Sequence, residues 1–215
     1  MIAYIREPFN ALSHLAGAIF SFAALLAMVI KSSYAQAPAV HLAAVMIFGI
    51  SLICLYSASA LYHSVIARPS VIAFLRKLDH SMIFALIAGS YAPFCLIALG
   101  GTLGWTLFSF VTAIGLSGIF FKMVWFHSPR WLSTALYIAM GWIIIFAAVP
   151  LADSMAFMGL VLLIFGGILY TIGGIIYGLK PKFLSSKYLG FHEIFHVFIL
   201  FGSLCHFLSV YFYVL

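Results

Sequence analysis

Seven long apolar stretches follow one another along the chain, and short segments rich in charged residues, proline and glycine separate them. Their predicted bounds are about 9–30, 40–64, 79–99, 103–121, 131–149, 156–178 and 188–213. A helix needs about 20 apolar residues to cross the hydrocarbon core of a bilayer, and each stretch is close to that length. The pattern therefore predicts an all-α, polytopic membrane protein that folds as a seven-transmembrane helix bundle.

The composition agrees with a chain that lies almost wholly in the membrane. Of the 215 residues, 66% are hydrophobic and 7% are charged, and the mean hydropathy is +1.24. Soluble globular domains carry about a quarter of charged residues, so a soluble enzyme is excluded. The stretches and their short connections use up the chain. We expect a single seven-helix membrane domain over residues 1–215.

Basic residues lie on alternate connections between the stretches. Nine of the ten Lys and Arg residues fall on the side of the N-terminus, and Lys31 alone falls on the other side. The nine are Arg6, Arg68, Arg76, Lys77, Lys122, Arg130, Lys180, Lys182 and Lys187. Positive residues stay in the cytoplasm, so the N-terminus is predicted to be cytoplasmic and the C-terminus outside. The net charge of +6 then reflects membrane orientation, and no nucleic-acid partner is expected.

That orientation is opposite to the one found in G-protein-coupled receptors. A retinal-binding pump would need a lysine within the last stretch, and the last stretch contains none. Both familiar classes of seven-helix protein are therefore disfavoured.

Histidines and a carboxylate gather at the predicted cytoplasmic ends of three stretches. His192 and His196 are four residues apart, which puts both rings on one face of a helix. His63 closes the second stretch, and Asp79 opens the third at a similar depth. An imidazole at membrane depth costs free energy unless it is paired or coordinated, and it is the commonest metal ligand. The pattern predicts a metal site, and zinc is the usual metal in a His-rich site.

Three histidines with one open position form the arrangement of a catalytic zinc site. Asp79 is a candidate to accept a proton from a zinc-bound water, and it is also a candidate to orient an imidazole. A third interpretation is that it only caps the N-terminus of the third helix. Ser59 precedes His63 by four residues on the same face and is the second catalytic candidate.

Other polar or small residues of the stretches have simpler interpretations. His206 lies about 15 Å deeper than the last ligand candidate and is expected to be an ordinary core histidine. His14 is near the cytoplasmic end and is a candidate partner of the ligands. His80 is expected to reach the membrane interface. Gly174 and Gly178 are expected to allow close packing within the bundle rather than to form a dimer face.

The segment His192-Glu-Ile-Phe-His196 also matches H-E-x-x-H, in which the glutamate is the general base of a zinc protease. In intramembrane proteases of the site-2 type this motif lies on an early helix, and a later aspartate completes the site. Here it lies in the last stretch with no aspartate after it, which disfavours a protease.

A set of motifs runs in order along nearly the whole chain. They are Asn10-x-x-Ser13-His14, Ser59-x-x-x-His63, Leu78-Asp-His-Ser-Met-Ile-Phe, Ala88-Gly-Ser-Tyr-Ala-Pro-Phe94, Met140-Gly-Trp and Gly190-Phe-His-Glu-Ile-Phe-His196. With them the chain resembles the haemolysin III family, within the superfamily of adiponectin/progestin receptors and alkaline ceramidases. The resemblance implies a seven-helix bundle with a cytoplasmic N-terminus.

The resemblance also implies zinc held by His63, His192 and His196, with Asp79 and Ser59 close to the metal. The receptor relatives carry Gln at the position of the glutamate between the last two histidines. This implies that Glu193 is not needed to bind zinc.

Two functions of different classes fit these observations. One is a zinc-dependent hydrolase that acts on a lipid amide or ester at the inner leaflet, and an open coordination position beside a carboxylate favours it. The other is a non-catalytic, zinc-stabilised membrane regulator or receptor-like protein that controls lipid composition. A third possible function is that of a cytolysin, which the family's name indicates, although nothing in the sequence argues for a pore. We expect membrane lipids as partners and a multi-pass protein of a bacterial inner (plasma) membrane.

Overall fold

A computed structural model describes residues 5–125, 128–181, 184 and 190–215. Seven helical crossings are long and apolar enough to span a membrane, and the described residues contain no β-strand. The helices are α1 (Pro8–Tyr34), α2 (Ala39–Ser64), α3 (Pro69–Pro93), α4 (Gly101–Val124), α5 (Arg130–Gly141), α6 (Ala148–Ser154), α7 (Phe157–Leu179) and α8 (Phe191–Ser209). The predicted all-α, seven-helix membrane protein is confirmed.

Three crossings contain turns of another type. The π-helical segment η1 (Phe94–Leu99) continues α3, and the π-helical segment η4 (Val210–Val214) continues α8. The 3₁₀ segment η2 (Trp142–Ala147) joins α5 to α6, so these three elements together make the fifth crossing. The regular helix of the third crossing ends at Pro93, where the sequence predicts a kink, because proline has no N–H to donate to the preceding turn.

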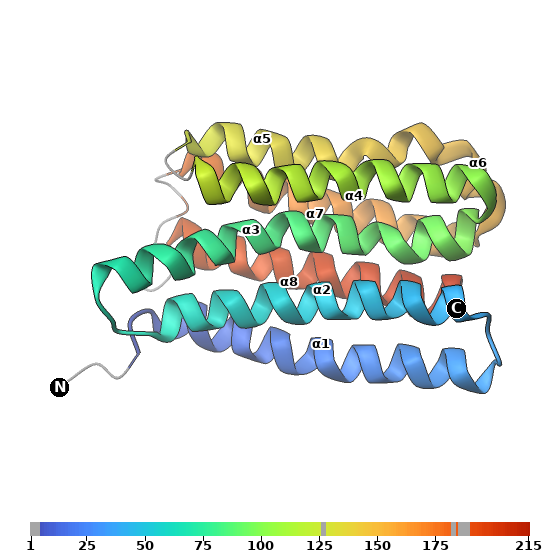
Figure 1. Ribbon diagram of the computed structural model, residues 1–215, viewed down its shortest axis with the longest axis horizontal. Helices are drawn as coiled ribbons and strands as arrows, with labels where there is room; N and C mark the ends of the chain where they lie inside the picture. The colour runs from blue at the N-terminus through green and yellow to red at the C-terminus, as the bar shows by residue number, and fades with distance from the viewer. Residues whose placement is uncertain (1–4, 126–127, 182–183, 185–189) are drawn as a thin grey trace.

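The helices lie side by side along the long dimension of the molecule (Figure 1). In this view α1 and α2 form one edge, α4 and α5 form the opposite edge, and α3, α7 and α8 lie between them. The two termini lie at opposite ends, as an odd number of crossings requires. We call the end at which α1, α3, α5 and α8 begin the N-terminal end of the bundle.

The third helix begins ten residues earlier than the hydropathy predicts. It starts at Pro69, so Asp79 lies inside the helix and Arg68 occupies the N-cap position. The interpretation of Asp79 as a helix cap is therefore wrong. Pro69 suits a first turn because its N–H would have no partner there. The adjacent Arg76 and Lys77 lower the local hydropathy, which hides this part of the helix from a hydropathy count.

Other boundaries also move outward. The first helix runs to Tyr34 and includes Lys31, and the fifth crossing runs to Ser154 and includes Pro150. The predicted start of the seventh stretch at 188 lies outside the described residues, and α8 is described from Phe191.

Two glycines of α7 lie against α5 inside the bundle. A Cβ atom built on Gly174 would lie 3.5 Å from side-chain atoms of Thr134 and Ile138, and one built on Gly178 would lie 3.4 Å from Thr134 Oγ1. These are close packing contacts between neighbouring helices of one chain. The prediction that the pair serves packing within the bundle is confirmed.

Candidate metal centre

Three imidazole rings meet at the N-terminal end of the bundle. His63 lies in the last turn of α2, and His192 and His196 lie in successive turns of α8. The Nε2 atom of His192 is 3.3 Å from that of His63 and 3.2 Å from that of His196. His63 and His196 are each 1% exposed, and one ligand atom from each of the three rings lies within 4.8 Å of the others. The structure thus brings together the three predicted ligands.

The spacing of these nitrogen atoms fits a metal ion. A tetrahedral zinc ion with Zn–N bonds of about 2.0–2.1 Å holds neighbouring ligand atoms about 3.3 Å apart. The two measured N–N distances, 3.2 and 3.3 Å, agree with that value. The three-histidine group could therefore hold a metal ion.

A carboxylate that the sequence analysis missed fixes one of the rings. The Nδ1–H group of His63 donates a hydrogen bond to Oε2 of Glu7 over 2.7 Å. With the proton on Nδ1, the Nε2 atom carries a lone pair that faces the other two histidines. A carboxylate bonded to the far nitrogen of a metal-binding histidine is the usual second partner of such a ring.

Glu7 belongs to a network that joins three helices. The Nδ2 group of Asn10 donates to Glu7 Oε2 over 3.1 Å and to Glu193 Oε1 over 3.2 Å, and Arg6 Nε lies 3.3 Å from Glu7 Oε1. Partial burial raises the pKa of Glu7, but the hydrogen bond from Asn10 and the neighbouring His63 and Arg6 outweigh it, so its pKa is below the ordinary value. Glu7 therefore stays ionised beside His63.

The sequence does contain a signal for Glu7. Glu7, Asn10 and His14 are spaced three and four residues apart, which places them on one face of a helix. The motif Asn10-x-x-Ser13-His14 begins one helical turn after Glu7 and therefore does not include it.

Glu193 is outside the group of ligand atoms. Its Oε2 atom accepts a hydrogen bond from the backbone N–H of Gly190 over 2.9 Å, so the Glu193 side chain caps the start of α8. The side chain that a zinc protease would use as a general base is thus engaged in helix capping and in the bond from Asn10.

Asp79 and Ser59 lie together beside the histidines. Both are buried, with 8% and 1% exposure, and both line the same cavity as His192 and His196. The Ser59 hydroxyl lies close to the Asp79 carboxyl group. Asp79 is outside the group of ligand atoms. The two catalytic candidates are therefore adjacent to the histidine group without belonging to it.

His14 contacts the ligand group directly, but through its ring face and not through a hydrogen bond to a ligand. Its ring stacks on that of His196 with centroids 3.7 Å apart and an angle of 16° between the planes. It is 3% exposed, and both ring nitrogens are without a hydrogen-bond partner among the described residues. The contact is one of ring packing.

Two further histidines, His80 and His206, are bonded within the bundle. His80 donates from Nδ1 to the carbonyl of Arg76 over 2.8 Å, and its Nε2 accepts from the Tyr177 hydroxyl over 3.0 Å. It therefore faces the bundle interior, and the expectation that it reaches the interface is wrong because α3 begins so early. His206 is buried, and its Nε2 lies 3.2 Å from the carbonyl oxygen of Leu163, which confirms the prediction of a core histidine.

Comparison with known proteins identifies the family. The sequence pattern of the family described as "Haemolysin-III related" matches residues 2–207. The chain is 42% identical to Hemolysin-3 of Bacillus cereus over 217 aligned residues, which cover 100% of this chain and 95% of that protein. The chain belongs to the haemolysin III family. It is also 39% identical to a Hemolysin-3 homolog of Bacillus subtilis (strain 168), over 99% of this chain and 96% of that one.

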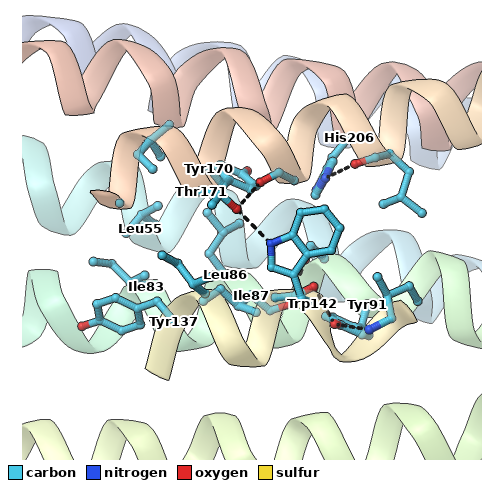
Figure 2. Close-up of a pocket in the computed structure, with 18 of the residues that line it drawn as sticks. Leu55, Ile83, Leu86, Ile87, Tyr91, Tyr137, Trp142, Tyr170, Thr171 and His206 are labelled. Atoms are coloured by element: carbon cyan, nitrogen blue, oxygen red, sulfur yellow. Dashed lines mark hydrogen bonds between the residues drawn. The ribbon is translucent and has the colours of Figure 1, made fainter. Parts of the chain in front are cut away.

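Behind the histidines, this haemolysin III protein contains an apolar cavity of about 380 Å³. Its lining residues include Ser59, Asp79 and His196. Trp142 of the fifth crossing, Tyr170 of α7 and His206 also line it (Figure 2). Several polar atoms of its wall are bonded within the protein. Trp142 Nε1 donates to Thr171 Oγ1 over 2.9 Å, and the Tyr91 hydroxyl donates to the carbonyl of Met140 over 2.9 Å. The surface left to a ligand is therefore almost wholly hydrocarbon.

A second pocket of about 320 Å³ lies on the opposite side of the histidines and is polar. Its wall includes Glu7, His63, Arg76, Arg130 and Glu193. The two pockets have three lining residues in common, which are His80, Tyr177 and His192. The histidine group therefore stands where a polar space and an apolar space meet.

Proposed function

We propose that this haemolysin III protein is a zinc-dependent hydrolase that cleaves an amide or ester bond of a membrane lipid. We place it in a bacterial inner membrane with its N-terminus in the cytoplasm. The observation that carries the proposal is the position of the three-histidine group at the junction of the polar pocket and the apolar cavity. A lipid has its acyl bond at the same junction between a polar head and an apolar tail.

The apolar cavity matches the acyl part of such a substrate. Its size is that of an ordinary ligand pocket, and such pockets are largely apolar with a few well-placed polar groups. Ile145 of η2 and Ile164 of α7 line it and are also 59% and 51% exposed on the outside of the bundle. The cavity thus reaches the lipid-facing surface between η2 and α7, where an acyl chain enters from the bilayer.

The residues around the junction have separate tasks in this proposal. His63, His192 and His196 would hold zinc, and Glu7 keeps the His63 ring in the tautomer that offers Nε2. A bound zinc ion supplies a Lewis acid that polarises a carbonyl group and lowers the pKa of a bound water to about 7. Asp79 accepts the proton released by the attacking nucleophile, and Ser59 holds the Asp79 carboxylate in place. The hydrocarbon wall of the cavity keeps bulk water from the reacting bond.

A second candidate is a non-catalytic protein in which the metal only fastens helices together. The network favours this reading, because the histidine group joins α2 to α8 and Glu7 and Asn10 tie both to α1. A cytolytic activity, which the relatives' names indicate, has no support in the contacts of the described helices.

The variant Asp79→Asn separates the two candidates. It nearly conserves volume and removes the proton acceptor while leaving the three histidines intact. A hydrolase predicts a variant with full zinc content and loss of lipid turnover, measured by mass spectrometry of lipid extracts from cells with and without the protein. Asp153→Asn is the matched control, since Asp153 is exposed in α6 and lines neither pocket. If Asp79→Asn keeps its zinc and restores the lipid composition of deficient cells, the hydrolase is refuted and the regulator takes its place.

A further inference from the structure

We propose that His14 is a positioning residue of the metal centre. Its ring fixes the plane of the His196 ring and so directs Nε2 of His196 at the metal. This inference rests on the proposed function, because it concerns the same three-histidine group. It adds a fourth histidine, which acts through its ring face and not as a ligand.

A metal-binding imidazole needs neighbours that fix its ring plane. The χ2 torsion of histidine has a broad, roughly twofold preference, so the torsion alone leaves the ring free to turn. In most metal-binding histidines a hydrogen bond from the second ring nitrogen holds the plane. His63 follows this rule, because its Nδ1–H group donates to Glu7.

His196 lacks such a hydrogen bond among the described residues. Its Nδ1 atom is buried and has no partner of hydrogen-bond geometry, although the backbone of Asn10 lies near the ring. The face of the ring is covered by His14, with the two centroids 3.7 Å apart and an angle of 16° between the planes. A turn of the His196 ring about χ2 would drive its edge into the face of His14. The stack therefore restrains the rotation that would turn Nε2 away from the metal.

His14 is itself held in place by α2. Its ring meets that of Tyr56 edge to face, with centroids 5.0 Å apart and an angle of 80° between the planes. Tyr56 is buried, and its hydroxyl donates to the carbonyl of Ile199 over 3.2 Å and is hydrogen-bonded to Ser203 Oγ over 2.6 Å. The side chain against which His14 packs is thus anchored to α8, the helix that carries His196.

A glycine lets α1 come close enough for these contacts. Gly17 lies one turn after His14 on the same face of α1. A Cβ atom built on Gly17 would lie 2.7 Å from Leu200 Cδ2 of α8 and 3.0 Å from Tyr56 Cδ1 of α2. Helix α1 therefore packs directly against both helices at this level, and His14 fills the space between Tyr56 and His196.

The role depends on the ring face of His14 and not on its nitrogen atoms. Both nitrogens lack a partner of hydrogen-bond geometry among the described residues, although the backbone of His196 lies near, and His14 is outside the group of ligand atoms. Another flat aromatic ring should therefore serve, whereas an aliphatic side chain should not.

Two substitutions separate the ring face from the ring nitrogens. His14→Phe keeps a flat ring and removes both nitrogens, and His14→Leu removes the flat ring as well. The control His206→Leu makes the same change at a buried histidine whose ring contacts are to Phe94 and Tyr170. Each purified variant that elutes as a single species is titrated with zinc against a chelating indicator. The visible absorption of its cobalt(II)-substituted form, which reports the geometry of the ligands, is also recorded.

The phenylalanine variant should rescue the site and the leucine variant should not. His14→Phe should bind zinc within about twofold of wild type and give the wild-type cobalt spectrum. His14→Leu should bind zinc about tenfold more weakly, which is the upper end of what an aromatic pair contributes. Its cobalt bands should also shift, because the His196 ring is no longer held in one plane. His206→Leu should match wild type in both measurements.

Three outcomes would overturn this role. A loss of zinc affinity in His14→Phe as large as that in His14→Leu would assign the effect to the ring nitrogens. An unchanged cobalt spectrum in His14→Leu would show that the stack does not orient His196. An equal loss of zinc affinity in His206→Leu would show a general effect of removing a buried histidine.

The outcomes also separate this role from the proposed function. Lipid turnover enters none of these measurements, so the rescue by phenylalanine supports the role of His14 even if no lipid is hydrolysed. Any of the three contrary outcomes overturns it even if hydrolysis is observed. Wild-type protein that binds no metal would refute the metal centre and the role of His14 together.

Discussion

Replacing Glu7 by Gln should weaken metal binding, although Glu7 touches no metal. Its carboxylate accepts the 2.7 Å hydrogen bond from His63 Nδ1–H, which fixes the tautomer and orientation of that ring. Loss of the partner behind a metal-binding histidine typically costs about 10–100-fold in affinity. A glutamine oxygen still accepts a bond from Nδ1–H, but without the charge that strengthens it.

The size of the expected loss of zinc affinity follows from how far His63 and Glu7 are exposed to solvent. The His63 ring is 1% exposed, whereas the Glu7 side chain is 40% exposed, so solvent screens part of the interaction. We therefore expect the lower end of the range, about tenfold, for Glu7→Gln and the upper end, about 100-fold, for Glu7→Ala, which removes the acceptor altogether.

The assay is a competitive zinc titration of purified protein against a chelating indicator. Glu193→Gln is the matched control, because it is the same substitution in the same network at a residue that caps α8 and is outside the group of ligand atoms. It should change the zinc affinity by less than about twofold, since its contacts are to Gly190 and Asn10. Equal zinc affinities of Glu7→Gln and wild type would refute the role of Glu7. A larger loss of zinc affinity in Glu193→Gln than in Glu7→Gln would instead indicate that Glu193 acts at the metal, as the glutamate of H-E-x-x-H does in a zinc protease.

Three further predictions address the fold, the cavity and the orientation. Gly104→Ala should lower the free energy of unfolding by about 1–3 kcal/mol, because the new Cβ would lie 2.0 Å from the Cys95 carbonyl oxygen. The control Gly141→Ala should not be destabilising, because a Cβ on Gly141 has no neighbour within 4 Å. Equal melting temperatures of the two variants would contradict this packing. Gly167→Leu should fill the apolar cavity, which Gly167 lines. The variant should keep its zinc and lose turnover of long-chain lipids, measured in lipid extracts. Unchanged turnover would exclude this cavity as the acyl site. A reporter active only outside the cytoplasm should be active when fused to Leu215, because nine of ten basic residues lie on the opposite side; a silent fusion on a protein shown to be present would reverse the orientation.

Most of the fold could be predicted because the bilayer sets the length of every crossing. The helix boundaries that were missed lie where charged residues or a proline interrupt a run of apolar residues. Arg76 and Lys77 hid the first ten residues of α3, although Pro69 marks a helix start by its own chemistry. Pro150 lies just beyond the predicted fifth stretch at 131–149, but it falls in α6, after the 3₁₀ segment η2.

The ligand histidines could be predicted because a polar ring in an apolar helix is costly and needs a reason. His192 and His196 were found by spacing alone, and His63 by its depth. Glu7 was missed because a charged residue just outside a membrane crossing stays solvated and costs no free energy, so its position needs no special explanation. Its role depends on the N-terminal segment docking on the end of α2, where the backbone N–H of Glu7 donates to the His63 carbonyl over 3.0 Å, a contact between residues far apart in sequence.

The central claim is that His63, His192 and His196 together hold one zinc ion. Metal analysis by mass spectrometry of purified wild-type protein and of the three His→Ala variants tests it most directly, with His206→Ala as the control for loss of a buried histidine elsewhere in the bundle. We predict about one zinc per chain in wild type and in His206→Ala, and loss of most of it in each of the other three, because two ligands hold the ion poorly. Equal zinc content in all the variants, or none in wild type purified with zinc present, would contradict it.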